Sequence, residues 1–369
     1  VKDKASKKIF APSGHEVEWV EEESYFFKLS KWQDKLLEYY NKNPNFIGPD
    51  SRKNEVISFV KGGLKDLSIS RTTFNWGIKV PNNENHVIYV WLDALINYLS
   101  AIGYPDKKYK KFWPANVHIV GKDILRFHAI YWPAFLLAAN IEPPKRIFAH
   151  GWWTNEGKKI SKSLGNVINP DELVKKYGLD SIRYFLLREV PFGNDGDYSS
   201  NALKRRINND LVNDLGNLVQ RVLTIIYKNF NGRLNKINSL NNEDKKLINL
   251  PKKILPEIEK NYEKQEFHKV LEKIWLLISN ANKYVDTTAP WELVKKDLSR
   301  AGDVLNLLAL LIAKIAIYLF PIMPTVSENI LSKIGISIIK IKLKDIKNDQ
   351  ILNLNFKVKK PEIIFQKIE

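Results

Sequence analysis

The stretch GWWTNEGKKISKSLGN, residues 151–166, gathers lysines among small and polar residues. Lys159 and Lys162 lie three residues apart, with Gly157 and Gly165 on either side. A loop bounded by glycines can close over a polyphosphate, so that ammonium groups meet the charge that builds on a departing pyrophosphate. The chain lacks the P-loop pattern G-x-x-x-x-G-K-[ST]. The alternative interpretation is a solvated basic loop with no ligand.

The charge of the whole chain also favours a phosphate-rich partner. Its 369 residues carry 58 Lys and Arg against 41 Asp and Glu, a net charge of +17. Such an excess suits a polyanion such as nucleic acid, because the cations replace condensed counterions. A bias of AT-rich coding toward Lys, Asn and Ile is the alternative explanation.

Cysteine is absent from the sequence. This excludes disulfides, thiolate zinc sites and a cysteine nucleophile within these residues, and we expect a reducing cytoplasm. The most apolar run, residues 304–324, approaches the length of a membrane span. Lys314 interrupts this run and Pro321 ends it, so we expect a helix buried in a bundle and no membrane association.

The first half of the chain alternates short apolar runs with amphipathic ones. We expect helices over 24–44, 52–64 and 124–140, and strands over 86–95, 116–123 and 146–154. Strands separated by helical crossovers predict βαβ units and a parallel sheet, whose ligands lie beyond the carboxyl ends of the strands. The residues expected at those ends are Trp91 and Asp93, Gly121 and Asp123, and His150 and Gly151.

The second half has long helical periodicity. Leu211, Leu215, Leu218, Val222 and Ile226 share one face of a helix expected over 208–230. Further helices are expected over 243–262, 265–286, 291–296 and 300–320, after a small mixed α/β element at 160–200. This half is therefore predicted to be a helical bundle.

Longer motifs connect these features to one enzyme family. KISKS (159–163) resembles the Lys-Met-Ser-Lys-Ser signature of class I aminoacyl-tRNA synthetases, with Ile160 in the Met position. Residues 89–105, 118–153 and 163–199 follow the methionyl-tRNA synthetase pattern, and the similarity runs from about residue 15 to the end. The resemblance implies a Rossmann-like nucleotide-binding half with a parallel sheet, followed by an all-α anticodon-binding bundle.

The resemblance also implies three domains. Residues 1–149 would hold the end of a connective insertion and the C-terminal half of the Rossmann catalytic domain. Residues 150–199 would form a stem-contact-type α/β segment with the KISKS loop. Residues 200–369 would be the α-helical anticodon-binding domain.

The resemblance assigns ATP contacts to several of the residues above. Lys159 and Lys162 match the catalytic lysines that stabilise the ATP phosphates, and Asp123 would accept hydrogen bonds from the ribose. The remaining ATP-binding residues would be Gly121, His150, Gly151 and Arg71. The alternatives are a helix N-cap for Asp123 and a plain surface position for Arg71.

A methionine side chain needs an apolar cavity with polarisable contacts to its sulfur, which aromatic rings provide. In many members of the family, Pro follows the alanine that lines this pocket. This alanine corresponds to Ala94, which is followed here by Leu95, so the edge of the pocket departs from the family pattern. Without the resemblance, such aromatic residues and a lone His128 are more typical of a core than of a pocket. The residues that match the methionine pocket are Trp91, Ala94, Tyr98, Ile124, His128 and Trp132.

The bundle offers residues suited to RNA. Asn213, Asn217 and Arg221 share one exposed stripe at i, i+4 spacing. Amide and guanidinium groups suit unstacked base edges, and an exposed aromatic ring suits stacking. By resemblance, Asn217, Arg221 and Trp291 read the CAU anticodon. The alternative for Trp291 is a core residue at a helix end.

The resemblance implies a methionine–tRNA ligase that uses ATP with Mg²⁺, L-methionine and tRNA(Met), with no zinc ligands in this chain. The alternatives are a class I synthetase for another apolar amino acid and a non-catalytic tRNA-binding fragment. The family's His-x-Gly-His motif does not occur in these residues, and the chain does not begin with Met. We therefore expect a C-terminal portion of a longer enzyme that, alone, does not form the adenylate at a useful rate.

Overall fold

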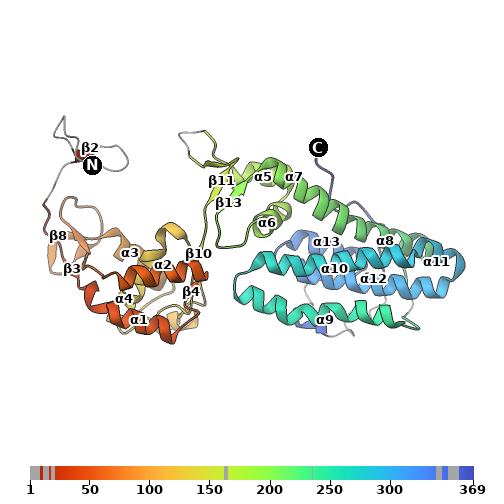
Figure 1. The fold of residues 1–369 in the computed structure, drawn as a ribbon, viewed down its shortest axis with the longest axis horizontal. Coiled ribbons are helices and arrows are strands. Elements are labelled where there is room, and N and C mark those ends of the chain that lie inside the picture. Colours follow the sequence, from red (N-terminus) through yellow and green to blue (C-terminus); the bar gives the residue numbers. More distant parts are fainter. Residues whose placement is uncertain are drawn as a thin grey trace. The chain divides into compact units, whose positions relative to one another are not determined.

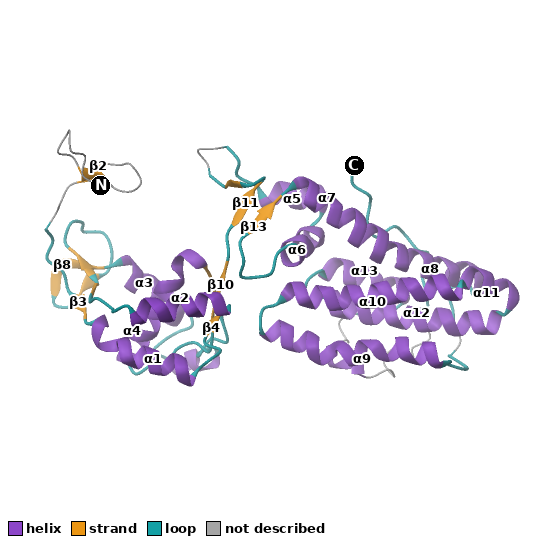
Figure 2. Ribbon diagram, in the orientation of Figure 1, coloured by secondary structure: helices purple, strands orange, loops and turns teal. Residues whose placement is uncertain are grey.

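The computed structural model describes residues 9–10, 16–17, 21–161, 165–234, 236–337, 343–347 and 357–369. The chain divides into two compact units after His150 (Figure 1). The first unit mixes helices with short strands, and the second is mostly helical (Figure 2). The predicted assignment of three functional domains to the chain stays a prediction.

A parallel sheet lies at the centre of the first unit. Its strands β4 (Ile47–Gly48), β10 (Ile147–His150) and β9 (His118–Gly121) are ordered β4-β10-β9. Ile147 is paired with both Ile47 and His118, and His150 is paired with Gly121. Residues 147–149 are all buried, as expected for a strand covered on both faces. The prediction of a parallel sheet is confirmed.

The described residues of this unit include four α-helices. In α1, Leu36 and Tyr40 are buried one turn apart, while Asp34 lies in the first turn and Lys42 in the last, where each charge suits the helix dipole. The Tyr40 hydroxyl donates a hydrogen bond of 2.6 Å to the carbonyl oxygen of Ala129. The helices are α1 (Gln33–Lys42), α2 (Asp50–Lys61), α3 (Val90–Ser100) and α4 (Trp132–Ala138), with a π-helical turn, Phe127–Tyr131, just before α4.

The prediction of one strand over 86–95 is wrong. The strand β8 (Asn83–Ile88) ends before this run does, and α3 begins at Val90. An apolar run of this length fits a strand or a buried helix equally well, so periodicity alone could not place the boundary. Trp91 and Asp93 therefore lie in α3 and not at the end of a parallel strand.

The other strands of this unit form antiparallel pairs. They are β6 (Ser70–Arg71) and β7 (Lys79–Val80) on either side of β8, β3 (Phe26–Phe27) with β5 (Leu67–Ser68), and β1 (Ile9–Phe10) with β2 (Glu16–Val17).

The second unit begins with a small sheet ordered β12-β11-β13. Here β11 (Trp153–Asn155) is antiparallel to β12 (Lys158–Lys159) and parallel to β13 (Gly196–Tyr198). The strand predicted over 146–154 is thus two strands, β10 and β11. The strand is interrupted at Gly151, where a Cβ would collide with the backbone of Asn194. Helices α5 (Pro170–Tyr177) and α6 (Leu179–Arg188) complete the predicted mixed element.

A helical bundle forms the rest of this unit. One continuous helical rod runs from Ser200 to Asn229 as α7 (Ser200–Arg206), a π-helical segment (Ile207–Gly216) and α8 (Asn217–Asn229). The helices predicted for the second half are confirmed. The helix predicted over 208–230 begins eight residues earlier, at Ser200, and the ends of the other four differ from the prediction by at most two residues. They are α9 (Asn242–Glu263), α10 (Phe267–Thr288), α11 (Pro290–Lys296) and α12 (Leu298–Leu319), followed by α13 (Pro324–Ile334) and a short 3₁₀ helix, Leu343–Lys347.

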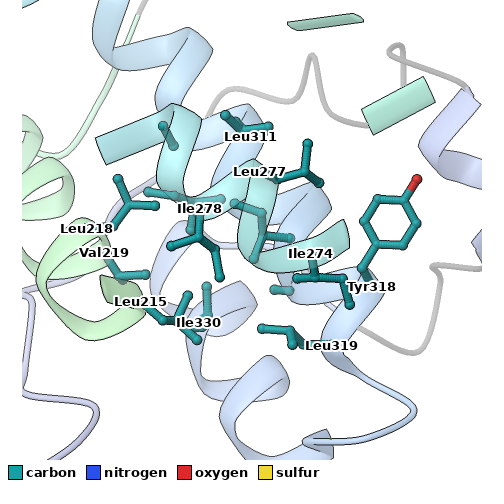
Figure 3. Packing of buried hydrophobic residues seen from close by; sticks show 14 of the residues in the cluster. Leu215, Leu218, Val219, Ile274, Leu277, Ile278, Leu311, Tyr318, Leu319 and Ile330 are labelled. Carbon is teal, nitrogen blue, oxygen red and sulfur yellow. The ribbon is translucent and has the colours of Figure 1, made fainter. Parts of the chain in front are cut away.

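The bundle core is continuous and apolar (Figure 3). Leu215 from the rod, Leu277 from α10 and Leu311 from α12 are each at most 1% exposed, and each such side chain contributes roughly 1.5–3 kcal/mol through burial. By length and composition alone α12 could cross a membrane, but 89% of its most apolar window is buried in the unit. This agrees with the predicted buried helix.

Candidate functional site

Aromatic side chains from α3 and from residues 124–138 meet in the first unit. The Tyr98 ring centroid lies 5.6 Å from that of His128 and 6.2 Å from that of Trp132. Trp132 and His128 are buried one turn apart, whereas Tyr98 remains 38% exposed. Three of the six residues predicted for the methionine pocket are therefore neighbours in space.

The Trp91 ring stacks on a residue that the sequence analysis did not select. Its centroid lies 3.7 Å from that of Phe127, with the ring planes 16° apart. Trp91 and Ile124 are half-buried and Ala94 is exposed. Leu95 is 1% exposed and belongs to a core cluster with Trp132, so this departure from the family pattern lies behind the aromatic residues.

A hydrogen-bonded chain connects two of these rings, Tyr98 and His128, to the backbone. The Nδ1 of His128 lies 3.0 Å from the carbonyl oxygen of Ile124, and its Nε2 lies 2.8 Å from the Tyr98 hydroxyl. A carbonyl oxygen only accepts, so Nδ1 carries the proton. Burial lowers the pKa of His128 despite the bond to Ile124, and the ring is neutral. Nε2 therefore accepts from Tyr98, and this apolar region contains no charged imidazole.

His118, the first residue of β9, was also missed by the sequence analysis. Its ring lies 4.2 Å from that of Tyr98 and 5.8 Å, edge-on, from that of Trp113. The residue is 7% exposed, and its Nδ1 has no hydrogen-bond partner among the residues that the structure describes. Burial and the nearby His128 lower the pKa of His118 to about 4. Its position at the start of an apolar strand was the only signal in the sequence.

The predicted ribose site lies at the carboxyl end of β9. A Cβ on Gly121 would lie 2.5 Å from the Asp123 Oδ1 and 3.9 Å from the His150 Cε1. Any other residue at position 121 would displace the carboxylate from this position. Asp123 is exposed and lies within the 3₁₀ turn Lys122–Ile124, whose N-cap is Gly121, so the N-cap alternative for Asp123 is wrong. The structure brings these three residues together at the edge where parallel sheets bind ligands.

Arg71 in β6 is held by several contacts. Its guanidinium lies over the Tyr89 ring at 4.3 Å and donates a hydrogen bond of 2.7 Å to the Ser68 hydroxyl. Its Nε lies 3.8 Å from a carboxylate oxygen of Glu22. These contacts restrict where the guanidinium can point.

The lysine loop, which carries KISKS (159–163), follows a tight hairpin formed by β11 and β12 in the second unit. Glu156 and Gly157 connect β11 to β12 with φ angles of 49° and 74°, as in the two-residue turns that suit hairpins. Lys159 ends β12 and is exposed. Lys162 lies outside the described residues. His150 is the last residue of the first unit and Gly151 is the first residue of the second, so the division of the chain falls between these two predicted ATP-binding residues.

Two of the predicted anticodon residues, Arg221 and Trp291, lie side by side in the bundle. The Arg221 guanidinium lies 5.1 Å from the centre of the Trp291 ring. Arg221 also donates a hydrogen bond of 2.8 Å to the Asp286 carboxylate, which the sequence analysis missed. Trp291 is 39% exposed, so the core alternative for this residue is wrong. Asn213 and Asn217 are exposed, while the leucine face of the same rod is buried.

Comparisons with known proteins agree with this arrangement. Residues 6–223 match the family model described as tRNA synthetases class I (M). Residues 236–369 match the model of the anticodon binding domain of methionyl tRNA ligase.

Among curated proteins, the methionine–tRNA ligase of Rickettsia felis is 54% identical over 97% of this chain and 71% of its own length. That of Brucella suis is 51% identical over 91% of this chain and 66% of its own length. A solved structure of Mycobacterium tuberculosis methionyl-tRNA synthetase in complex with methionyl-adenylate is 43% identical, with a TM-score of 0.91 over 98% of this chain and 72% of that one. The chain belongs to the methionyl-tRNA synthetase family of class I aminoacyl-tRNA synthetases.

Proposed function

We propose that this protein activates L-methionine with ATP and transfers the methionyl group to tRNA(Met). In the first step a methionine carboxylate oxygen attacks the α-phosphorus of ATP, and pyrophosphate leaves. In the second, a ribose hydroxyl at the 3′ end of the tRNA attacks the carbonyl carbon of the adenylate, and AMP leaves. ATP enters as its magnesium complex, and we expect the reaction to take place in the cytoplasm.

One juxtaposition supports this proposal most strongly. Gly121 and Asp123 lie at the end of β9, and the next turns of the same segment carry His128 and Trp132 against Tyr98. The carboxylate that we propose to bind the ribose is therefore followed, a few residues along the chain, by the residues of an aromatic slot. This slot, formed by Tyr98, His128 and Trp132, is proposed to bind the thioether. A methionyl adenylate needs both, because it joins an amino acid to a nucleotide through one phosphoryl group.

The polar atoms of the slot suit an uncharged side chain. Tyr98 donates to His128, and His128 donates to Ile124, so these hydrogen atoms are already used. A thioether accepts hydrogen bonds only weakly and gains mainly from contact with aromatic rings. In our proposal Trp91, Ala94, Tyr98, Ile124, His128 and Trp132 bind methionine.

The lysines act on the leaving group. Lys159 and Lys162 stabilise the negative charge that grows on pyrophosphate, a contribution made mainly in the transition state. Gly121, Asp123, His150, Gly151 and Arg71 complete the proposed ATP-binding set.

The bundle selects the tRNA in this proposal. Trp291 offers an exposed ring for stacking on a base, and Arg221 and Asn217 offer donors for base edges. The ion pair with Asp286 holds the Arg221 guanidinium over the ring before any RNA arrives.

The test is amino-acid-dependent ATP–pyrophosphate exchange by the gene product that carries this chain. Methionine should support exchange, and leucine and isoleucine should not. Lys159→Ala and Lys162→Ala should each slow exchange by roughly 10²-fold with little change in methionine affinity, while Lys158→Ala, on the opposite face of β12, should not. A preference for leucine or isoleucine would favour the alternative of a class I synthetase for another apolar amino acid. Binding of tRNA without exchange would favour the alternative of a non-catalytic tRNA-binding fragment.

A further inference from the structure

Asn166 joins the two ends of the lysine loop. Its Oδ1 accepts a hydrogen bond of 2.9 Å from the Ser161 N–H, and its Nδ2 donates one of 3.0 Å to the carbonyl oxygen of Lys159. Its own carbonyl oxygen accepts a bond of 2.8 Å from the Asn155 side chain. The side chain thus contacts the backbone on both sides of Ile160.

This geometry requires a carboxamide. Lys159 offers an acceptor and Ser161 a donor, so one side chain must supply both a donor and an acceptor about one peptide group apart. The amide of Asn166 takes the place of a neighbouring strand just where β12 ends at Lys159. Aspartate would keep the bond to Ser161 and lose the bond to Lys159, and alanine would lose both.

A second set of contacts fixes the opposite end of the same hairpin. Asp197 in β13 accepts hydrogen bonds from the Thr154 hydroxyl and, at 2.8 Å, from the Gly157 N–H. These two bonds lower the pKa of the exposed Asp197, with the Thr154 bond the larger cause. Thr154 is in turn the register partner of Lys159 across the hairpin. The backbone of Lys159 is therefore held through β11 on one side and through Asn166 on the other.

We propose that Asn166 is a positioning residue for the Lys159 ammonium group. The inference rests on the proposed function, in which that group meets a departing pyrophosphate. A charge offset by about 1 Å from the reacting atoms costs roughly 10²-fold in rate. Without the Asn166 bridge, the backbone of Lys159 loses one of its two sets of contacts and keeps only its pairing with Thr154 in β11, so the position of the ammonium group is less restricted.

The test compares Asn166→Ala and Asn166→Asp with Asn169→Ala in the gene product that carries this chain. Asn169 is a matched control, because its side chain caps α5 through a 2.9 Å bond from the Asp171 N–H. Exchange kinetics give kcat and the KM for methionine, and hydrogen–deuterium exchange reports the Ser161 amide.

Asn166→Ala should lower kcat by roughly 10- to 100-fold with the methionine KM changed less than about twofold. The Ser161 amide should exchange faster in this variant. Asn166→Asp should keep that amide protected and lose an intermediate part of kcat. Asn169→Ala should lower the melting temperature without changing kcat.

The outcomes separate the two proposals. A wild-type protein without methionine-dependent exchange would overturn the proposed function and this inference with it. An active wild type whose Asn166→Ala variant keeps its kcat would overturn this inference alone. So would a loss in kcat equal to that of Asn169→Ala, because that result would make Asn166 merely structural.

Discussion

The hydroxyl oxygen of Tyr98 lies 2.8 Å from Nε2 of a buried, neutral His128. Replacing Tyr98 by Phe removes this donor and leaves a buried ring nitrogen unpaired. We expect Tyr98→Phe to weaken methionine binding by about tenfold, the equivalent of one lost hydrogen bond. Titration of tryptophan fluorescence with methionine measures this, since Trp91 and Trp132 lie in the same aromatic group.

Tyr104→Phe serves as the control, because Tyr104 is 41% exposed and its ring contacts Tyr109. Equal methionine affinity in the Tyr98 and Tyr104 variants would show that the hydrogen-bonded pair of Tyr98 and His128 does not belong to the methionine-binding site.

The buried His118 predicts a pH-dependent stability. Its pKa is about 4 in the folded chain and about 6.5 in the unfolded chain. Above pH 6.5 both states are neutral and the histidine contributes no pH dependence. As the pH falls from 6.5 toward 4 the unfolded chain takes up the proton first, so that stability drops by about 2 kcal/mol between pH 7 and pH 5.

His118→Phe should remove this drop, because phenylalanine keeps an aromatic ring and eliminates the unpaired Nδ1. Urea unfolding at pH 7 and pH 5 checks the prediction. An unchanged difference between the two pH values in the variant would show that other groups cause it.

A buried ion pair in the bundle should control stability. Asp244 is fully buried and accepts bonds of 2.6 and 2.8 Å from Arg300. Burial raises the pKa of Asp244, but hydrogen bonds from Arg300, Tyr284 and the Asn241 backbone outweigh it and lower the pKa overall. The stability from this carboxylate is thus present above about pH 4 and is lost as the pH falls further.

Arg300→Met should cost roughly 3–5 kcal/mol of unfolding free energy at pH 7, since it leaves a buried carboxylate without its cation. Lys246→Met is the control, because Lys246 pairs with Glu243 on the surface of the same helix, and it should change stability by less than about 0.5 kcal/mol. Similar costs in urea unfolding would contradict the role of burial.

The Arg221–Trp291 pair predicts a separation of two assays. Trp291→Ala should lower tRNA charging by roughly 10- to 100-fold, the range for one base–aromatic stack, while ATP–pyrophosphate exchange stays normal. The control is Tyr227→Ala, which removes an exposed aromatic ring from α8 and should affect neither assay. Equal losses in charging and exchange for Trp291→Ala would refute the assignment of this residue to RNA.

The bundle could be predicted closely from sequence because its signals are local. The buried positions Leu211, Leu215, Leu218, Val222 and Ile226 recur at helical spacing. Pro290 at the start of α11 and Pro324 at the start of α13 fix where those helices begin. Residues 86–95 carried no such signal, and the prediction of a strand was wrong there.

The residue types of the candidate site were also predictable, but their partners were not. Tyr98 and His128 are 30 positions apart, and Arg221 and Asp286 are 65 apart. Such pairs arise only when separate helices pack together. His118, Phe127, Asp286 and Asn166 each have an ordinary local interpretation, as strand, helix or loop residues, and only the folded chain reveals their contacts.

The rod from Ser200 to Asn229 has a mechanical consequence. It starts two residues after β13, and the Ser200 N–H donates a bond of 3.0 Å to Glu156 in the turn of the lysine hairpin. Arg221 lies roughly 30 Å further along the same rod. The turn of the hairpin and Arg221 are thus connected through one continuous helix, so that a tilt of this helix would also move the strand beside Lys159.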